Sequence, residues 1–159
     1  MTLKYSPLDW LLEIVSLAAL GAMYGLAAGS WSGLPDVVPT HFGISGTPNS
    51  WGDKRSIWLV PAIGLFIYLL LTVSARYPRL VNLPFRVDRD APEVQRVIFR
   101  LLASSKAATM LLLAYIVYGQ VQSAMRQTNS LGIAFIPLFL IATFVPFAVY
   151  LKQLRRYKQ

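Results

Sequence analysis

The chain has 159 residues, 55% of them hydrophobic and only 14% charged, where soluble domains carry roughly 25% charged residues. This composition argues against a water-soluble fold, and the absence of cysteine excludes disulfides, thiolate metal sites and cysteine nucleophiles. The formal net charge is +8, and the basic residues lie beside apolar segments instead of forming a run with interleaved aromatic residues. We therefore expect them to face an anionic membrane surface, and we expect no nucleic-acid partner.

The apolar residues gather in four blocks, each close to the ~20 residues that cross a hydrocarbon core. They predict a single-domain, all-α polytopic membrane protein, a four-helix bundle with transmembrane helices at about residues 10–29, 57–75, 107–125 and 131–151. We interpret the first block as a mature helix, because Asp9 and Glu13 stand where a signal peptide would carry basic residues.

The first helix carries Gly21, Gly25 and Gly29 at four-residue spacing, a ridge of small residues that lets another helix backbone approach closely. We favour packing inside the protein's own bundle as its use. Homo-oligomerisation, or docking to a protein partner through the same face, is the alternative.

The third helix is expected to begin before the membrane. Asp90 and Glu93 have the spacing of an N-cap and its capping partner around Pro92. From there to about residue 125 the helix exceeds the bilayer thickness by several turns. Lys106 lies near the point of entry, and we expect its long side chain to reach the headgroups.

The orientation follows from the positions of Lys and Arg. Most of them lie in the connecting segment 76–106 or after Leu151, and Lys4 precedes the first helix. Only Lys54, Arg55 and Arg126 lie in the other two loops. The positive-inside rule therefore predicts a multi-pass protein of the cytoplasmic (inner) membrane, with both termini and the 76–106 loop in the cytoplasm.

The loop of residues 31–56 is the most informative segment, and we expect it to be ordered on the extracytoplasmic side. Three prolines and three glycines between Leu34 and Lys54 rule out a continuous helix and favour successive turns, with a tight reversal at Gly46-Thr47-Pro48-Asn49. The candidate ligand-binding or loop-structuring residues are Pro35, Asp36, Pro39, His41, Phe42, Gly46, Pro48, Asn49, Trp51, Gly52 and Lys54.

His41 is the sole histidine, and Asp36 lies five residues before it. Together with Asp53 it offers three conceivable metal ligands, but their spacing matches no characteristic metal motif. We therefore prefer a structural hydrogen bond between His41 and Asp36 and assign no metal, cofactor or catalytic residue. The chain also lacks carboxylates or a broken helix at the membrane midplane, so we do not favour a transporter.

The loop resembles a widespread bacterial and archaeal membrane domain of unknown function, with the approximate signature LPDxxPxHFxxxGxPDxWGxK. The same domain forms the N-terminal part of the Sdp toxin-immunity proteins. Leu34 and the candidate loop residues other than Asn49 match this signature, and Asn49 stands where the family commonly has Asp.

The resemblance implies a non-enzymatic protein that recognises an envelope peptide or ligand through the extracytoplasmic loop, in an immunity or signalling role. Two alternatives stand beside it. One is an accessory or structural subunit of a larger respiratory or photosynthetic membrane complex. The other is an enzyme with a site centred on His41.

Overall fold

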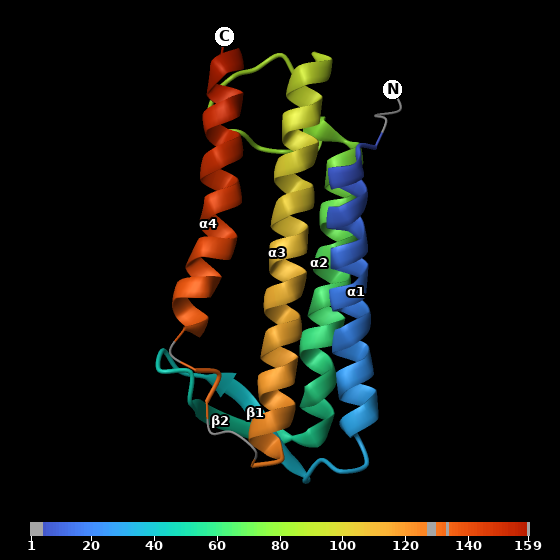
Figure 1. The fold of residues 1–159 in the computed structure, drawn as a ribbon, viewed down its shortest axis with the longest axis vertical. Coiled ribbons are helices and arrows are strands. Elements are labelled where there is room, and N and C mark those ends of the chain that lie inside the picture. Colours follow the sequence, from blue (N-terminus) through green and yellow to red (C-terminus); the bar gives the residue numbers. More distant parts are fainter. Residues whose placement is uncertain (1–4, 127–129, 133, 159) are drawn as a thin grey trace.

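The computed structural model describes residues 5–126, 130–132 and 134–158. Lys4, on which the predicted orientation partly rests, lies outside these ranges. The described chain is helical apart from one small antiparallel sheet (Figure 1). Its elements are α1 (Pro7–Ser30), β1 (Val37–Phe42), β2 (Pro48–Asp53), α2 (Leu59–Arg76), α3 (Pro92–Ala124) and α4 (Phe135–Leu154), with short 3-10 helices at Lys54–Trp58, Pro78–Leu80 and Arg155–Tyr157.

Four helices of the described chain are long and apolar enough to cross a membrane, which confirms the predicted fold class. Each begins within a few residues of an expected block, except α3. That helix starts at Pro92 and runs for 33 residues, about 50 Å at ~1.5 Å per residue, where the expected transmembrane part starts at 107.

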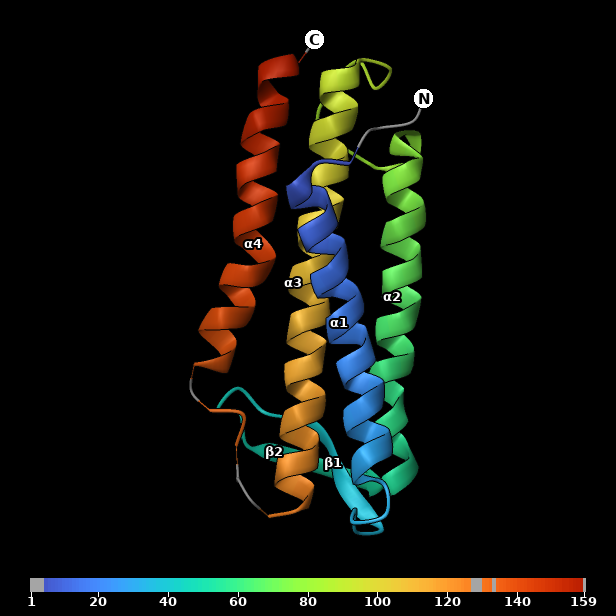
Figure 2. The ribbon, with the colours of Figure 1, turned by 45° about the vertical axis from the view of Figure 1, so that its right-hand side comes forward.

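α3 is the central helix of the bundle. It packs against α1, α2 and α4, whereas α1 and α2 contact each other less extensively. Figures 1 and 2 show α4 on the opposite side of α3 from the α1–α2 pair. Most of the α4 surface is therefore left without a neighbour among the described helices, and its large apolar side chains are exposed.

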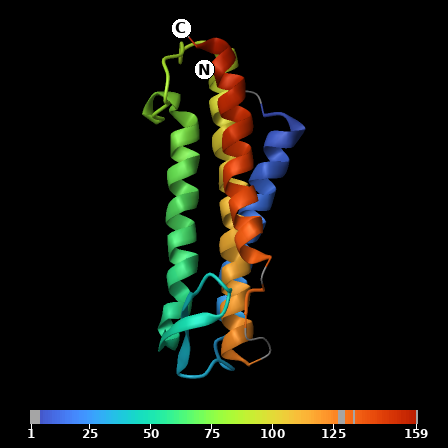
Figure 3. The ribbon, with the colours of Figure 1, turned by 90° about the vertical axis from the view of Figure 1, so that its left-hand side faces the viewer.

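The two ends of the bundle differ. The start of α1, the end of α4 and the α2–α3 connection lie together at what we call the basic end, and the β1–β2 hairpin lies at the opposite, hairpin end (Figure 3). At the basic end, Val94 and Ile98 of α3 bury their side chains against Leu154 and against apolar residues of the α2–α3 connection. This small core explains why α3 continues past the length a bilayer requires.

The helix starts differ in their capping. Ser6 caps α1: its Oγ accepts a hydrogen bond from the Asp9 backbone N–H, and the Asp9 carboxylate accepts one from the Ser6 N–H at 2.7 Å. The cap predicted for α3 was wrong. Ala91 is the N-cap residue, and the Asp90 carboxylate instead accepts two hydrogen bonds from Arg79 at 2.8 and 3.0 Å.

The glycine ridge of α1 faces away from the bundle. Apart from the adjacent backbone of α1 itself, a Cβ built on Gly21, Gly25 or Gly29 would meet no described atom within 4 Å. The buried face of α1 is the one that carries Met23 and Ala27. Our preferred interpretation, packing inside the bundle, is therefore wrong for the described helices, and the use of the ridge by a partner stays a prediction.

Candidate functional site

The segment between α1 and α2 folds as a hairpin whose tip is a short turn. β1 and β2 pair antiparallel in a register that places Val38 opposite Gly52 and Pro39 opposite Trp51. The chain reverses over residues 43–47, where Gly43 N–H donates to the Thr47 carbonyl and Gly46 N–H to the Gly43 carbonyl, both at 2.8 Å. The reversal thus begins three residues earlier than the predicted 46–49 turn and overlaps it only at Gly46 and Thr47, because Pro48 and Asn49 already belong to β2.

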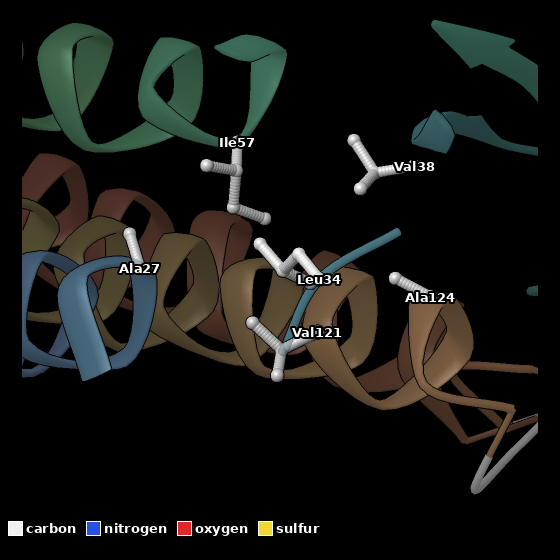
Figure 4. Packing of buried hydrophobic residues seen from close by; sticks show 6 residues of the cluster. All are labelled: Ala27, Leu34, Val38, Ile57, Val121 and Ala124. Carbon is white, nitrogen blue, oxygen red and sulfur yellow. The ribbon is translucent and has the colours of Figure 1, made fainter. Parts of the chain in front are cut away.

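An apolar cluster fixes the hairpin on the helix ends. It consists of Ala27, Leu34, Val38, Ile57, Val121 and Ala124, with Trp31 and Trp58 packed against it. Figure 4 shows the six side chains of the cluster itself, which come from the end of α1, the hairpin segment, the segment before α2 and the end of α3. Leu34 of the signature is therefore a core residue, and so is Pro39, whose carbonyl accepts a hydrogen bond from Gln120 Nε2 at 3.0 Å.

The hairpin tip is bonded to the connection between α3 and α4. Leu131 N–H donates to the Gly46 carbonyl at 2.8 Å, and Ser130 Oγ donates to the Ser45 carbonyl at 3.3 Å. Gly46 has φ +78°, and a Cβ there would lie 2.9 Å from Ser130 Oγ. Both the left-handed backbone and the close approach require glycine at this position.

His41 does not pair with Asp36, so that prediction was wrong. Its Nδ1 lies 2.6 Å from Asn49 Oδ1, across the hairpin. Alternate residues of a strand share one face, and pairing brings Asn49 closer to His41 than the sequence suggests. Asp53 instead caps the Lys54–Trp58 helix by accepting a hydrogen bond from Arg55 N–H at 2.8 Å. Among the described residues no three His, Cys, Asp or Glu side chains are grouped as a metal site would require.

Of the remaining signature residues, some stabilise the fold of the hairpin and one is exposed to solvent. Lys54 Nζ lies 4.8 Å from the centroid of the Trp31 ring, a cation–π contact that holds both side chains. Gly52 packs closely against Thr40, since a Cβ there would lie 2.9 Å from Thr40 Cγ2 and the threonine side chain would have to shift. Trp51, in contrast, keeps 52% of its surface exposed.

Beside Trp51 lies a cavity of about 640 Å³, which we call the hairpin cavity. Residues 33–35, Val37 and Trp51 form one wall, and residues 123–126 at the end of α3 form the other. It therefore brings Pro35 and Trp51 of the signature together with α3 residues that sequence reasoning did not select. The sequence did hold one clue to this second wall: Arg126 is one of the few basic residues outside the basic segments.

A second polar cluster lies inside the bundle, toward the basic end. Lys106 Nζ is 2.7 Å from Glu13 Oε2 and 2.9 Å from Thr72 Oγ1, and the Tyr68 hydroxyl donates to Glu13 Oε1. The Lys106 side chain is only 4% exposed, so the expectation that it reaches the headgroups was wrong. A carboxylate within reach in a low-dielectric interior is the stronger partner.

Asp9 continues this cluster one helical turn toward the basic end. Its side chain is fully buried, with Oδ2 at 2.8 Å from Arg96 Nη1 and Oδ1 at 3.6 Å from Arg100 Nε. Two carboxylates of α1 thus pair with three cations of α3. The arrangement joins the two helices and pairs charges that would be costly alone in an apolar setting, while Asp9 Oδ1 and Arg100 Nε make no hydrogen bond among the described residues.

Fold and site together define the class of protein: a multi-pass helical membrane protein with an ordered hairpin seated on one end of its bundle. In the comparisons with known proteins, the family described as Domain of unknown function (DUF1648) matches residues 17–65, from the middle of α1 through the whole hairpin to α2. The chain is thus similar to a family of unknown function over the segment that carries the candidate site.

One relative is an uncharacterized protein of Archaeoglobus fulgidus. It is 33% identical over 81 residues, which cover 46% of this chain and 43% of the relative. The chain therefore spans less than half the length of that protein. No solved structure matches.

Proposed function

We propose that the protein is a non-enzymatic membrane protein whose hairpin end faces away from the cytoplasm and recognises an envelope peptide or ligand. The observation that carries the proposal is the hairpin cavity of about 640 Å³, a volume typical of ligand sites. An exposed tryptophan beside such a cavity is a common anchor for a bound partner.

The ordering of the hairpin supports recognition by a preformed surface. The apolar cluster around Leu34 and the bonds from the tip to residues 130 and 131 hold the cavity wall in place before any ligand arrives. A ligand that meets a preformed wall loses less free energy to ordering the protein. An immunity or signalling role, as the resemblance to the Sdp proteins implies, uses recognition of this kind.

The proposal is tested in cells that carry or lack the gene, challenged with a panel of envelope-active peptides. Expression is expected to change sensitivity to at least one peptide, and Trp51→Ala is expected to abolish that change. Ile44→Ala is the matched control, because Ile44 is 88% exposed at the hairpin tip and does not line the cavity. Equal sensitivity with and without the gene across the panel contradicts the proposal.

A second candidate function is that of an accessory or structural subunit in a larger membrane complex, such as a respiratory or photosynthetic one. The observation that favours it is the glycine ridge, which no described helix covers. Purification in mild detergent separates the two functions. A stoichiometric large complex supports the subunit, whereas a free monomer or homodimer removes its main support.

A further inference from the structure

The lining of the hairpin cavity is chemically simple. Arg126 is the one ionisable residue among the lining residues that the structure describes, and no acidic side chain accompanies it. Apart from Ser123, the other side chains of the lining are apolar or absent. A cation at the edge of an apolar cavity is complementary to a ligand that carries a negative charge on an apolar body.

Ser123 adds an independent observation. The residue is only 5% exposed, and its Oγ is buried without a hydrogen-bond partner among the described residues. Buried hydroxyl groups in folded proteins are nearly always hydrogen-bonded, because an unmade bond is costly. Ser123 lines the cavity, so rotation of its hydroxyl about χ1 toward the cavity would let a ligand oxygen supply the missing partner.

The backbone of Arg126 has an uncommon conformation. It follows the C-cap residue Met125 with φ +56°, the left-handed conformation that helices normally end on with glycine. A bulky residue is disfavoured in this conformation, and such strain concentrates at functional positions. Arg126 therefore occupies a position where glycine would be more stable.

From these three observations we infer that the hairpin cavity binds the C-terminal residue of a peptide, taking its carboxylate on Arg126 and Ser123 and its apolar side chain against Trp51. The carboxylate accepts from the planar guanidinium and from the hydroxyl of Ser123. This inference rests on the proposed function and names the part of the peptide that is recognised.

The test uses two pools of N-acetylated hexapeptides of identical mixed sequence ending in Leu, Ile or Phe, one with a free carboxylate and one with a C-terminal amide. Binding to the purified protein is measured by calorimetry in detergent, and decanoate serves as a third probe that carries a carboxylate without a peptide. The free-carboxylate pool is expected to bind about tenfold more tightly than the amide pool, the low end for a hydrogen-bonded charge that is partly exposed.

Arg126→Gly is the decisive variant. It is expected to remove the preference for the carboxylate while raising the melting temperature, a combination that simple damage to the fold does not produce. Arg55→Gln is the matched control, since Arg55 is an exposed cation of the same end that does not line the cavity, and it is expected to leave the preference intact.

The outcomes separate this inference from the proposed function. Equal binding of both pools that Trp51→Ala abolishes overturns carboxylate recognition and leaves peptide recognition standing. Tighter binding of decanoate than of the free-carboxylate pool overturns the peptide as the source of the carboxylate. If neither pool binds, the inference is overturned. The cellular challenge with Trp51→Ala then tests the proposed function separately.

Discussion

The buried ion pair between Glu13 and Lys106 makes a quantitative prediction about stability. Replacing Lys106 with Met removes the cation and leaves the Glu13 carboxylate with the hydrogen bond from the Tyr68 hydroxyl. Breaking a buried pair by removing one partner costs about 3–5 kcal/mol of unfolding free energy. Because the Glu13 side chain is 20% exposed, we expect the low end, about 3 kcal/mol.

The double variant Glu13→Gln/Lys106→Met tests the origin of this loss. It contains no buried charge at either position, and the introduced glutamine keeps an oxygen that accepts from the Tyr68 hydroxyl. We therefore expect a stability within about 1 kcal/mol of the wild type, since an ion pair replaced by well-packed neutral groups is often neutral. Most of the loss in Lys106→Met then reflects the unpaired carboxylate.

The exposed pair Arg79–Asp90 is the matched control. Its atoms are 2.8 Å apart, almost the same as the 2.7 Å between Lys106 and Glu13, but its side chains are 77% and 70% exposed. Arg79→Gln is therefore expected to cost at most about 1 kcal/mol. Denaturant unfolding in detergent, followed by circular dichroism, measures all variants. A Lys106→Met cost no larger than that of Arg79→Gln would refute the buried arrangement.

Two further predictions concern glycines. Gly46→Ala is expected to destabilise the protein by about 2–3 kcal/mol, because φ is +78° and Ser130 Oγ lies 2.9 Å from the new Cβ. Gly132→Ala is the control: its φ of +83° is similar but no described atom lies within 4 Å of the new Cβ, so we expect a cost of only about 1 kcal/mol. If unfolding experiments gave the same loss of stability for both variants, the close contact between the hairpin tip and Ser130 would be refuted. Gly25→Ala is expected to stabilise the isolated chain by about 0.5–1 kcal/mol, since the position is helical and open, and native mass spectrometry shows whether the same change lowers association. Unchanged association would argue against a partner on the ridge.

The sequence predicted the membrane-spanning elements well because they depend on a local property. A run of about 20 apolar residues indicates a transmembrane helix whatever the rest of the chain does. The same reasoning identified the loop that carries Trp51 and Pro35 as the informative segment. It could not identify the cavity, because the second wall comes from residues 123–126, far along the chain.

Three of the errors share one physical cause, because each concerns a neighbour that only the tertiary structure determines. His41 was assigned Asp36 on sequence proximity, whereas strand pairing presents Asn49. Lys106 was assigned the headgroups on side-chain length, whereas Glu13 is brought to it by the packing of α1 on α3. The glycine ridge was assigned to the bundle interior, although spacing alone does not say which face of a helix is covered.

One labelling experiment tests both the outward orientation of the hairpin end and ligand binding in the hairpin cavity. The chain has no cysteine, so single substitutions can be labelled selectively in intact cells with a maleimide that does not cross the membrane. Val37 is 53% exposed and lines the cavity, whereas Ile44 is 88% exposed and does not. Val37→Cys and Ile44→Cys are therefore a matched pair of labelling variants.

We expect both cysteines to be labelled from outside, and we expect the free-carboxylate peptide pool to slow labelling at position 37 but not at position 44. Failure of both positions to label without lysis would contradict the outward orientation, and equal labelling rates with and without the pool would contradict binding in the cavity.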